Sequence, residues 1–112
     1  MSRFIPDAGD IVWIQFSPSV GREQSGHRPA AVLTQKHYNQ RSGLLFCVPL
    51  TSKVKGYPFE VPVGSGDDRG VALVDHARSI DWEGRKVRPK GKLASEELAA
   101  IRERLAILTG ME

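Results

Sequence analysis

The polar segment of residues 21–29 carries side chains that could perform acid–base chemistry on a phosphodiester. Glu23 and Arg28 lie five residues apart in it, and Gly21 and Gly26 allow tight turns that could bring the two side chains together. An ionised Glu23 could accept a proton from a hydroxyl, while the Arg28 guanidinium could hold a phosphate and neutralise charge developing on it. The alternative for this pair is a surface salt bridge that stabilises the protein by under about 1 kcal/mol.

His27, in the same segment, is a candidate general acid, because an unperturbed histidine titrates near neutral pH, with a pKa of about 6.5. It could instead hydrogen-bond to the backbone and brace the segment. His37 and His76 belong to separate parts of the chain and lack the spacing of metal ligands. We therefore expect no catalytic metal and no cofactor.

The elements that must position these residues are mostly strands. Runs of β-branched and aromatic residues bounded by turn residues predict strands at 10–16, 30–34, 44–51, 57–63, 71–75 and 77–81, with polar connections at 36–43 and 64–70. Pro49 cannot donate to a strand ladder, so it predicts a sheet edge or a bulge, and Thr51 falls where the same strand opens into a loop. Strands at this spacing are typical of a small barrel or sandwich.

One helix is predicted at the C-terminal end of the chain. Ser95 is its candidate N-cap, Glu96 and Glu97 favour the positive end of the helix dipole, and Gly110 ends it. One face carries four apolar residues that would close one side of the barrel: Leu98, Ile101, Leu105 and Leu108.

The length of the chain limits its organisation. With 112 residues, we expect a single domain over 1–112 with one hydrophobic core. No signal peptide and no run long enough to span a bilayer is apparent, which predicts a cytoplasmic protein with no membrane partner. Cys47 is the single cysteine, so no internal disulfide can form, and its apolar neighbours predict a buried thiol rather than a nucleophile.

Charge and aromatic residues leave several interpretations open. The net charge of +3 permits a nucleic-acid partner, and basic residues cluster at 53–55 and 85–92, where they could face the same way or simply be solvated. We expect Trp13 in the core, whereas Phe16 and Tyr57 could be core residues or could stack on bases. Asp75, next to His76, is expected to close a strand end, although the pair could orient a catalytic group.

Five stretches distributed along the chain form a recognisable pattern. They are residues 6–10 (PDAGD), 23–29 (EQSGHRP), 47–51 (CVPLT), 55–60 (KGYPFE) and 70–75 (GVALVD). On these motifs the chain resembles the MazF/PemK family of toxin endoribonucleases, and the 55–60 motif is similar to the MazF branch in particular. The resemblance implies an SH3-like barrel of the CcdB/PemK type that forms a homodimer, cleaves single-stranded RNA without a metal ion, and is inhibited by a small antitoxin.

The resemblance also implies roles for individual residues. The acid of the family's catalytic loop falls on Glu23, its arginine on Arg28, and the threonine that follows the Val-Pro pair on Thr51. An arginine that shares the chemistry in the PemK branch has no counterpart here, because Leu73 occupies its position and only Asp75 matches.

The reaction that we expect uses a nucleophile supplied by the RNA. The ribose 2′-OH attacks the adjacent phosphorus and gives a 2′,3′-cyclic phosphate and a 5′-OH, with Glu23 as base, Arg28 as phosphate clamp and Thr51 as hydrogen-bond donor. Three candidates remain for the proton donor: His27, water and Arg28. His27 also matches the family motif, whereas a pKa above about 12 makes the Arg28 guanidinium a poor acid. The expected substrate contacts are Gln24, Phe16, Lys53, Lys55, Tyr57, Asp75 and Arg85.

Two other functions are compatible with this fold class. A CcdB-like toxin binds DNA gyrase through a tryptophan-containing C-terminal tail, whereas residues 108–112 here contain no tryptophan. An adaptor for proline-rich peptides needs an aromatic-lined groove, and the chain has only two Trp and two Tyr. For regulation, we expect a MazE-like antitoxin whose acidic C-terminal segment lies along a basic groove and displaces RNA.

Overall fold

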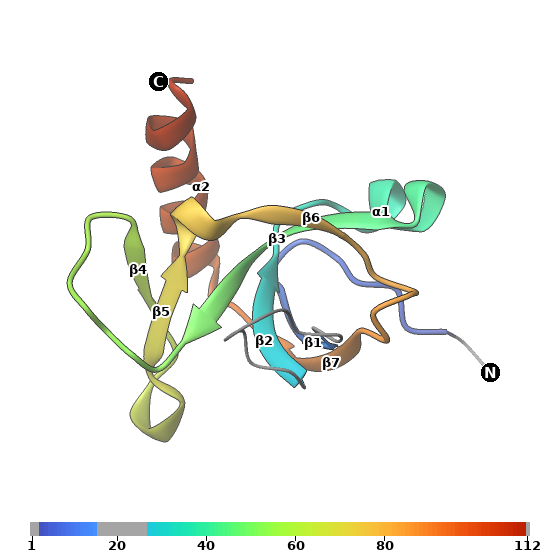
Figure 1. The fold of residues 1–112 in the computed structure, drawn as a ribbon, viewed down its shortest axis with the longest axis horizontal. Coiled ribbons are helices and arrows are strands. Elements are labelled where there is room, and N and C mark those ends of the chain that lie inside the picture. Colours follow the sequence, from blue (N-terminus) through green and yellow to red (C-terminus); the bar gives the residue numbers. More distant parts are fainter. Residues whose placement is uncertain (1–2, 16–26, 112) are drawn as a thin grey trace, which may run out of the picture.

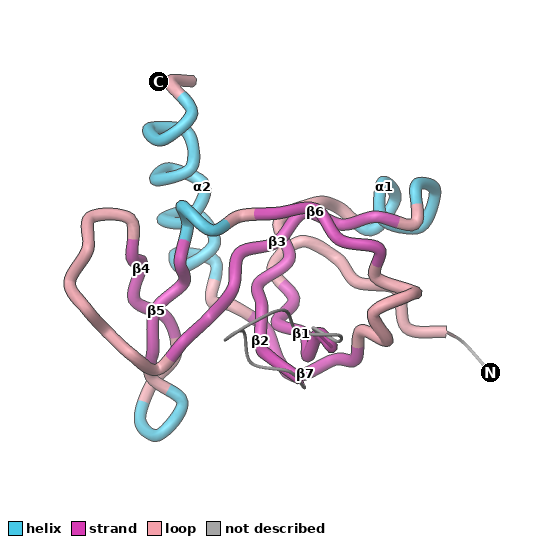
Figure 2. The backbone as a smooth tube through the Cα atoms, viewed as in Figure 1, coloured by secondary structure: helices cyan, strands magenta, loops and turns pink. Residues whose placement is uncertain are grey.

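Antiparallel strands form most of the fold in the computed structural model, which describes residues 3–15 and 27–111 (Figure 1). The strands are β1 (Asp10–Gln15), β2 (His27–Val32), β3 (Leu44–Thr51), β4 (Glu60–Val63), β5 (Gly70–Leu73), β6 (Arg78–Asp81) and β7 (Arg88–Lys92). Two helices, α1 (Lys36–Ser42) and α2 (Ser95–Thr109), lie at separate ends of the strand layer (Figure 2). The predicted mainly β fold with a C-terminal helix is confirmed.

β3 connects the two parts of this half-barrel. The sheet order is β4-β5-β3-β2-β1-β7, and β6 also pairs with β3. The first half of β3 pairs with β6, whereas its last two residues, Leu50 and Thr51, pair with Ala72 and Val71 of β5. The other edge of β3 pairs with β2. A single strand therefore joins the β1–β2–β7 side of the molecule to the β4–β5 hairpin.

Two clusters of buried side chains lie on opposite faces of β2 and β3. Because neighbouring residues of a strand point to opposite faces, Ala30 and Cys47 join one cluster while Ala31 and Val48 join the other. The remaining buried members of the first are Val12, Ile14, Val32, Leu45, Ile80 and Trp82, and those of the second are Leu33, Val61, Val63, Ala72, Val74 and Ile101. Burial on both faces explains why the second half of β2 and most of β3 read as continuous apolar runs.

Pro49 does not lie in an edge strand, so this part of the prediction was wrong. It is paired with Ala30 of β2 on one side. On its other side it lies between Cys47, which pairs with β6, and Leu50, which pairs with β5. Pro49 thus occupies the point at which β3 changes partners, and a proline is tolerated at such an interruption of the ladder.

Two elements were missed in the sequence. Residues 36–43, predicted as a polar connection, form α1, whose only buried residue is Asn39, so no apolar periodicity marks this helix. Residues 88–92, predicted as part of a basic loop, form the edge strand β7, in which every residue is exposed. The alternation of polar and apolar residues that reveals a half-buried strand is therefore absent there.

Helix α2 begins close to the predicted position. Ala94, rather than Ser95, is the N-cap residue, and its N–H donates to the Glu97 Oε1 atom at 2.8 Å. The other carboxylate oxygen of Glu97 accepts the Gly64 N–H at 2.8 Å, which ties the start of the helix to the β4–β5 hairpin. Gly110, with a left-handed φ of 75°, ends the helix as predicted.

The apolar face of α2 is shorter than predicted. Ile101 is fully buried, and Leu98 and Leu105 pack against the same cluster. Leu108, the last predicted member of the face, is 43% exposed. The helix therefore covers the β4–β5 side of the fold with its first two thirds only.

Candidate nucleic-acid interface

A groove of about 1180 Å³ runs along the ends of β2 and β3. Its walls come from residues 52–57, the β4–β5 hairpin, residues 75–78 and β7. Among the residues that the structure describes, seven Lys and Arg line the groove against four carboxylates: Arg28, Lys53, Lys55, Arg69, Arg78, Lys90 and Lys92 against Glu60, Asp67, Asp68 and Asp75. This excess of positive charge suits a polyanionic ligand.

Arg28 and Thr51 lie at the floor of the groove, on neighbouring strands. Ala30 is paired with Pro49 in the β2–β3 ladder, and Arg28 and Thr51 each lie two residues beyond this pair, at the same end of the ladder. Both residues line the groove and are partly buried. The predicted phosphate clamp and the predicted hydroxyl donor therefore lie at the same end of the β2–β3 ladder and line the same groove.

The Thr51 hydroxyl is oriented by the backbone of the following loop. Its Oγ1 atom accepts the Lys53 N–H at 3.2 Å. A hydroxyl that accepts from the backbone can still donate its own proton. Thr51 can therefore donate a hydrogen bond to an anion in the groove.

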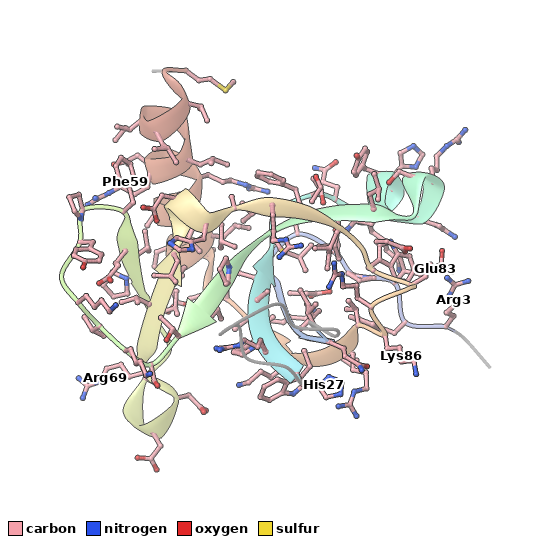
Figure 3. The ribbon with its side chains drawn as sticks, in the orientation of Figure 1. Arg3, His27, Phe59, Arg69, Glu83 and Lys86 are labelled. Carbon is pink, nitrogen blue, oxygen red and sulfur yellow. The ribbon has the colours of Figure 1, made fainter. Side chains whose placement is uncertain are left out.

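His27 and Arg28 take different directions from β2. They are consecutive residues of the strand, so their side chains point to opposite faces. His27 is exposed at the start of β2 (Figure 3), and within the described part of the chain it is not among the residues that line the groove. Arg28, and not His27, therefore shares the described lining of the groove with Thr51.

The other predicted contacts divide into three groups. Lys53, Lys55, Tyr57 and Asp75 line the groove, and Tyr57 is 61% exposed there. Arg85 lies in the turn between β6 and β7, outside the described lining, and its carbonyl accepts the Gln15 N–H at 3.2 Å. The predicted base and two predicted contacts lie outside the described residues: Glu23, Gln24 and Phe16.

Lys90 and Lys92 were not singled out in the sequence. They line the groove from β7, and the Lys90 ammonium lies 5.2 Å from the centre of the Trp13 ring. Trp13 is only partly buried, so its predicted place in the core was wrong, and Trp82 is the tryptophan of the core. No strand signal in the sequence of β7 could have placed both lysines on one strand, because Lys, Pro and Gly are all depleted in strands.

Asp75 and His76 lie in a short 3₁₀ turn, Val74–His76, between β5 and β6. The strand predicted to reach Asp75 thus ends at Leu73. The Nε2 atom of His76 is 4.0 Å from the Asp75 Oδ1 atom, and both side chains are about half exposed and line the groove. A pair as loose as this stabilises the fold by little.

Cys47 is buried beneath the groove, as predicted. Burial raises the pKa of its thiol from 9.0 to about 12, although the positive charge of Arg78 opposes part of this shift. A thiol with this pKa is not a nucleophile near neutral pH.

The raised pKa of Cys47 predicts how the stability of the fold changes at high pH. Because folding raises the pKa of Cys47, the thiol ionises at a lower pH in the unfolded chain than in the folded protein. The contribution of the neutral thiol to the free energy of unfolding is therefore complete below pH 9 and should be lost as the pH rises towards 12. We expect the unfolding free energy of the wild type to decrease relative to that of Cys47→Ala by up to about 1.4 kcal/mol per pH unit in this window. Urea unfolding at pH 8 and pH 10.5 measures it, and parallel pH dependences of the two proteins would contradict the assignment.

The described segments contain no helix that is both long and apolar enough to cross a membrane. They also contain no group of three or more His, Cys, Asp or Glu side chains arranged to hold a metal ion.

Comparison with known proteins identifies the family. The family model described as "PemK-like, MazF-like toxin of type II toxin-antitoxin system" matches residues 7–109. This chain belongs to the PemK/MazF toxin family. Among curated family members, it is 46% identical to the endoribonuclease toxin MazF of Escherichia coli K12 over 110 residues, which cover 98% of this chain and 99% of the relative. It is 34% identical to the E. coli endoribonuclease toxin ChpB over 96 residues, 80% of this chain and 82% of the relative.

Solved structures of the PemK/MazF family share the fold. MazF from Deinococcus radiodurans superposes with a TM-score of 0.86 at 43% identity, covering 96% of this chain and 99% of that one. A chain of a MazE–MazF structure from the same organism gives a TM-score of 0.87 at 40% identity, covering 98% and 100%. The resemblance inferred from the five sequence motifs is confirmed by these relationships.

Proposed function

We propose that this chain, as one toxin domain over residues 1–112, is a sequence-specific, metal-independent endoribonuclease that cleaves single-stranded RNA in the cytoplasm. The observation that carries the proposal is that Arg28 and Thr51 line one basic groove, in a chain whose relatives reported above are named endoribonucleases. The CcdB-like alternative is not favoured, because no relative reported above is a gyrase-binding toxin.

In the proposed reaction the ribose 2′-OH attacks the adjacent phosphorus, and the 5′-oxygen leaves. Glu23 accepts the proton of the 2′-OH, and the products are a 2′,3′-cyclic phosphate and a 5′-OH end. Arg28 and Thr51 act on the phosphoryl oxygens, where negative charge increases in the transition state. Such stabilisation is effective because the donors are already fixed by two paired strands and need no reorganisation.

Water is the proposed proton donor to the leaving 5′-oxygen. The side chain of His27 leaves β2 on the face opposite to Arg28, and a guanidinium is a poor acid. Solvent can reach the leaving group, since the groove is open along its length.

The proposed partner is an antitoxin with an acidic, extended segment that occupies the same groove. Its carboxylates would pair with the lysines and arginines that otherwise bind phosphates. The solved MazE–MazF structures from D. radiodurans support a partner of this kind. We also propose that the active toxin is a homodimer.

A substrate that lacks a single oxygen tests the reaction. Sequencing of cleavage ends from a long RNA, in EDTA, first defines the site that is cut. A short RNA containing that site should be cleaved in EDTA to a 2′,3′-cyclic phosphate and a 5′-OH. The same RNA with a 2′-deoxy sugar at the scissile position should remain intact, because it has no nucleophile.

Two controls separate the possible outcomes. A 2′-deoxy sugar placed one position away should leave cleavage intact, which shows that the substitution does not simply prevent binding. Continued cutting at the substituted bond would refute the 2′-OH mechanism. Loss of all cutting in EDTA, with recovery on adding Mg²⁺, would refute metal independence.

A further inference from the structure

We infer that Glu60 is a positioning residue that holds the turn of residues 52–59 so that Lys55 and Tyr57 face the RNA groove. This inference rests on the proposed RNA-cleaving function. Glu60 is the first residue of β4, is partly buried and lines the groove together with Lys55 and Tyr57. A carboxylate in a groove built for phosphates needs a reason, because it repels the ligand.

The reason lies in the hydrogen bonds of the Glu60 carboxylate. It accepts the Gly56 N–H at 2.9 Å and the Lys55 N–H at 3.2 Å to Oε1 and 3.3 Å to Oε2. The Glu60 N–H in turn donates to the Tyr57 carbonyl at 3.1 Å. Three successive residues of the turn are thus attached to one side chain and its own backbone, and hydrogen bonds to a charged acceptor are the stronger kind.

Other contacts fix the two ends of the turn but not its middle. At the start, the Lys53 N–H donates to the Thr51 hydroxyl. At the end, the Val74 N–H donates to the Phe59 carbonyl at 3.1 Å, and the Arg104 guanidinium of α2 donates to the Pro58 carbonyl. Figure 3 shows Phe59 beside α2. Between these points, the side-chain hydrogen bonds described above for Lys55 and Gly56 come from Glu60.

Gly56 is matched to this arrangement. Its φ of +79° lies in the left-handed region, which other residues adopt at a cost of about 1–2 kcal/mol. A Cβ added there would meet nothing within 4 Å, so glycine is needed for the backbone conformation and not for space. In this conformation the Gly56 N–H donates to the Glu60 carboxylate, and Gly56 lies between Lys55 and Tyr57 in the turn.

The consequence for RNA is the placement of two complementary side chains. Tyr57 is 61% exposed, and an exposed aromatic ring can stack on an unpaired base, while the Lys55 ammonium can contact a phosphate. Without Glu60 both side chains would remain but would no longer be held in place. Binding should then weaken, whereas the chemistry at Arg28 and Thr51 should persist.

Steady-state cleavage of a short fluorogenic RNA by Glu60→Ala and Glu60→Gln tests the inference. We expect Glu60→Ala to raise KM about tenfold, the loss typical of one stacked base, with kcat within about twofold of the wild type. Glu60→Gln should stay near the wild type, because its amide oxygen can still accept the Gly56 N–H. Glu103→Ala, which removes an exposed glutamate of α2, is the matched control and should change neither constant.

Two measurements distinguish positioning from other roles. Tyr57→Ala should raise KM several-fold in the wild type but much less in Glu60→Ala, because the ring is already misplaced there. Amide hydrogen exchange of Lys55 and Gly56 should be faster in Glu60→Ala than in the wild type, with that of Val48 unchanged. Unchanged exchange at Lys55 and Gly56 would overturn the inference.

A different kinetic pattern would also overturn it. If Glu60→Gln and Glu60→Ala both lose kcat to the same extent, then Glu60 takes part in the chemistry itself. If the wild type does not cleave RNA at all, the proposed function fails, while the exchange measurement still reports whether Glu60 holds the turn.

Discussion

Arg28→Ala is expected to lower kcat/KM for RNA cleavage by about a thousandfold, mainly through kcat. Arg28 lines the same groove as Thr51, where its guanidinium could bind the phosphoryl oxygens as charge builds up on them. Removing one fixed donor from such a site typically costs 10²–10³ in rate, and removing an arginine that stabilises a phosphoryl transition state can cost about 10³ or more. Arg28→Lys should recover only a small part, because an ammonium cannot bind two oxygens in parallel.

The comparison variants for this prediction come from the same chain. His27→Ala should keep activity within about tenfold of the wild type, because His27 leaves β2 on the opposite face. Arg102→Ala removes an exposed arginine of α2 and should have no effect. The measurement is initial rates on the fluorogenic RNA, with circular dichroism as the check of folding. Near wild-type cleavage by Arg28→Ala would remove Arg28 from the mechanism.

Asn39→Ala is expected to destabilise the fold by about 3 kcal/mol without touching the groove. Asn39 is fully buried, and its side-chain amide donates to the Pro6 carbonyl at 2.8 Å and to the Thr34 carbonyl at 2.9 Å. Its Oδ1 atom accepts the Thr34 hydroxyl at 2.6 Å, and that hydroxyl accepts the Phe46 N–H at 3.0 Å. Truncation leaves several buried polar groups without a partner and opens a cavity, each of which costs about 1–3 kcal/mol.

Urea unfolding measures this effect as a shift of the transition midpoint at constant slope. Gln40→Ala and His37→Ala are suitable controls, because both residues are exposed on the same helix and should change stability by less than about 0.5 kcal/mol. Asn39→Asp should be at least as destabilising as Asn39→Ala, since it places a charge at a fully buried site and removes both N–H donors. A midpoint for Asn39→Ala within the range of the two controls would show that the network contributes nothing.

The sequence was informative where the physical signal is local and apolar. The strands β1, β3, β4, β5 and β6, the helix α2 and the burial of Cys47 follow from such runs and their bounding turn residues. Asn39 gave no such signal, because its burial depends on the Pro6 carbonyl of the N-terminal segment, 33 residues away in sequence, and on the Thr34 carbonyl just before α1. An asparagine in a polar stretch reads as a surface residue until those partners are known.

The lining of the groove could be predicted only in part, because some of its residues are placed there by contacts between segments distant in sequence. Arg28, Thr51, Lys53, Lys55, Tyr57 and Asp75 were identified from residue type and family motifs, and all six line it. Lys90 and Lys92 were noted only as members of the basic cluster 85–92 and not as individual contacts, because their place in the groove depends on β7 pairing beside β1, a long-range contact. Trp13 was misplaced for the same reason, since Lys90 covers a ring that composition alone assigns to the core.

Because β3 pairs with strands of both parts of the sheet, substitutions near its end and substitutions in the groove walls should have different effects. Thr51 ends a strand whose middle is buried on both faces, so we expect the proposed reacting centre to resist local opening better than the loops around it. The walls that would meet the bases come instead from the 52–59 turn and the β4–β5 hairpin. Substitutions in those walls can therefore alter which RNA sequence is cut while the reaction at the floor stays the same.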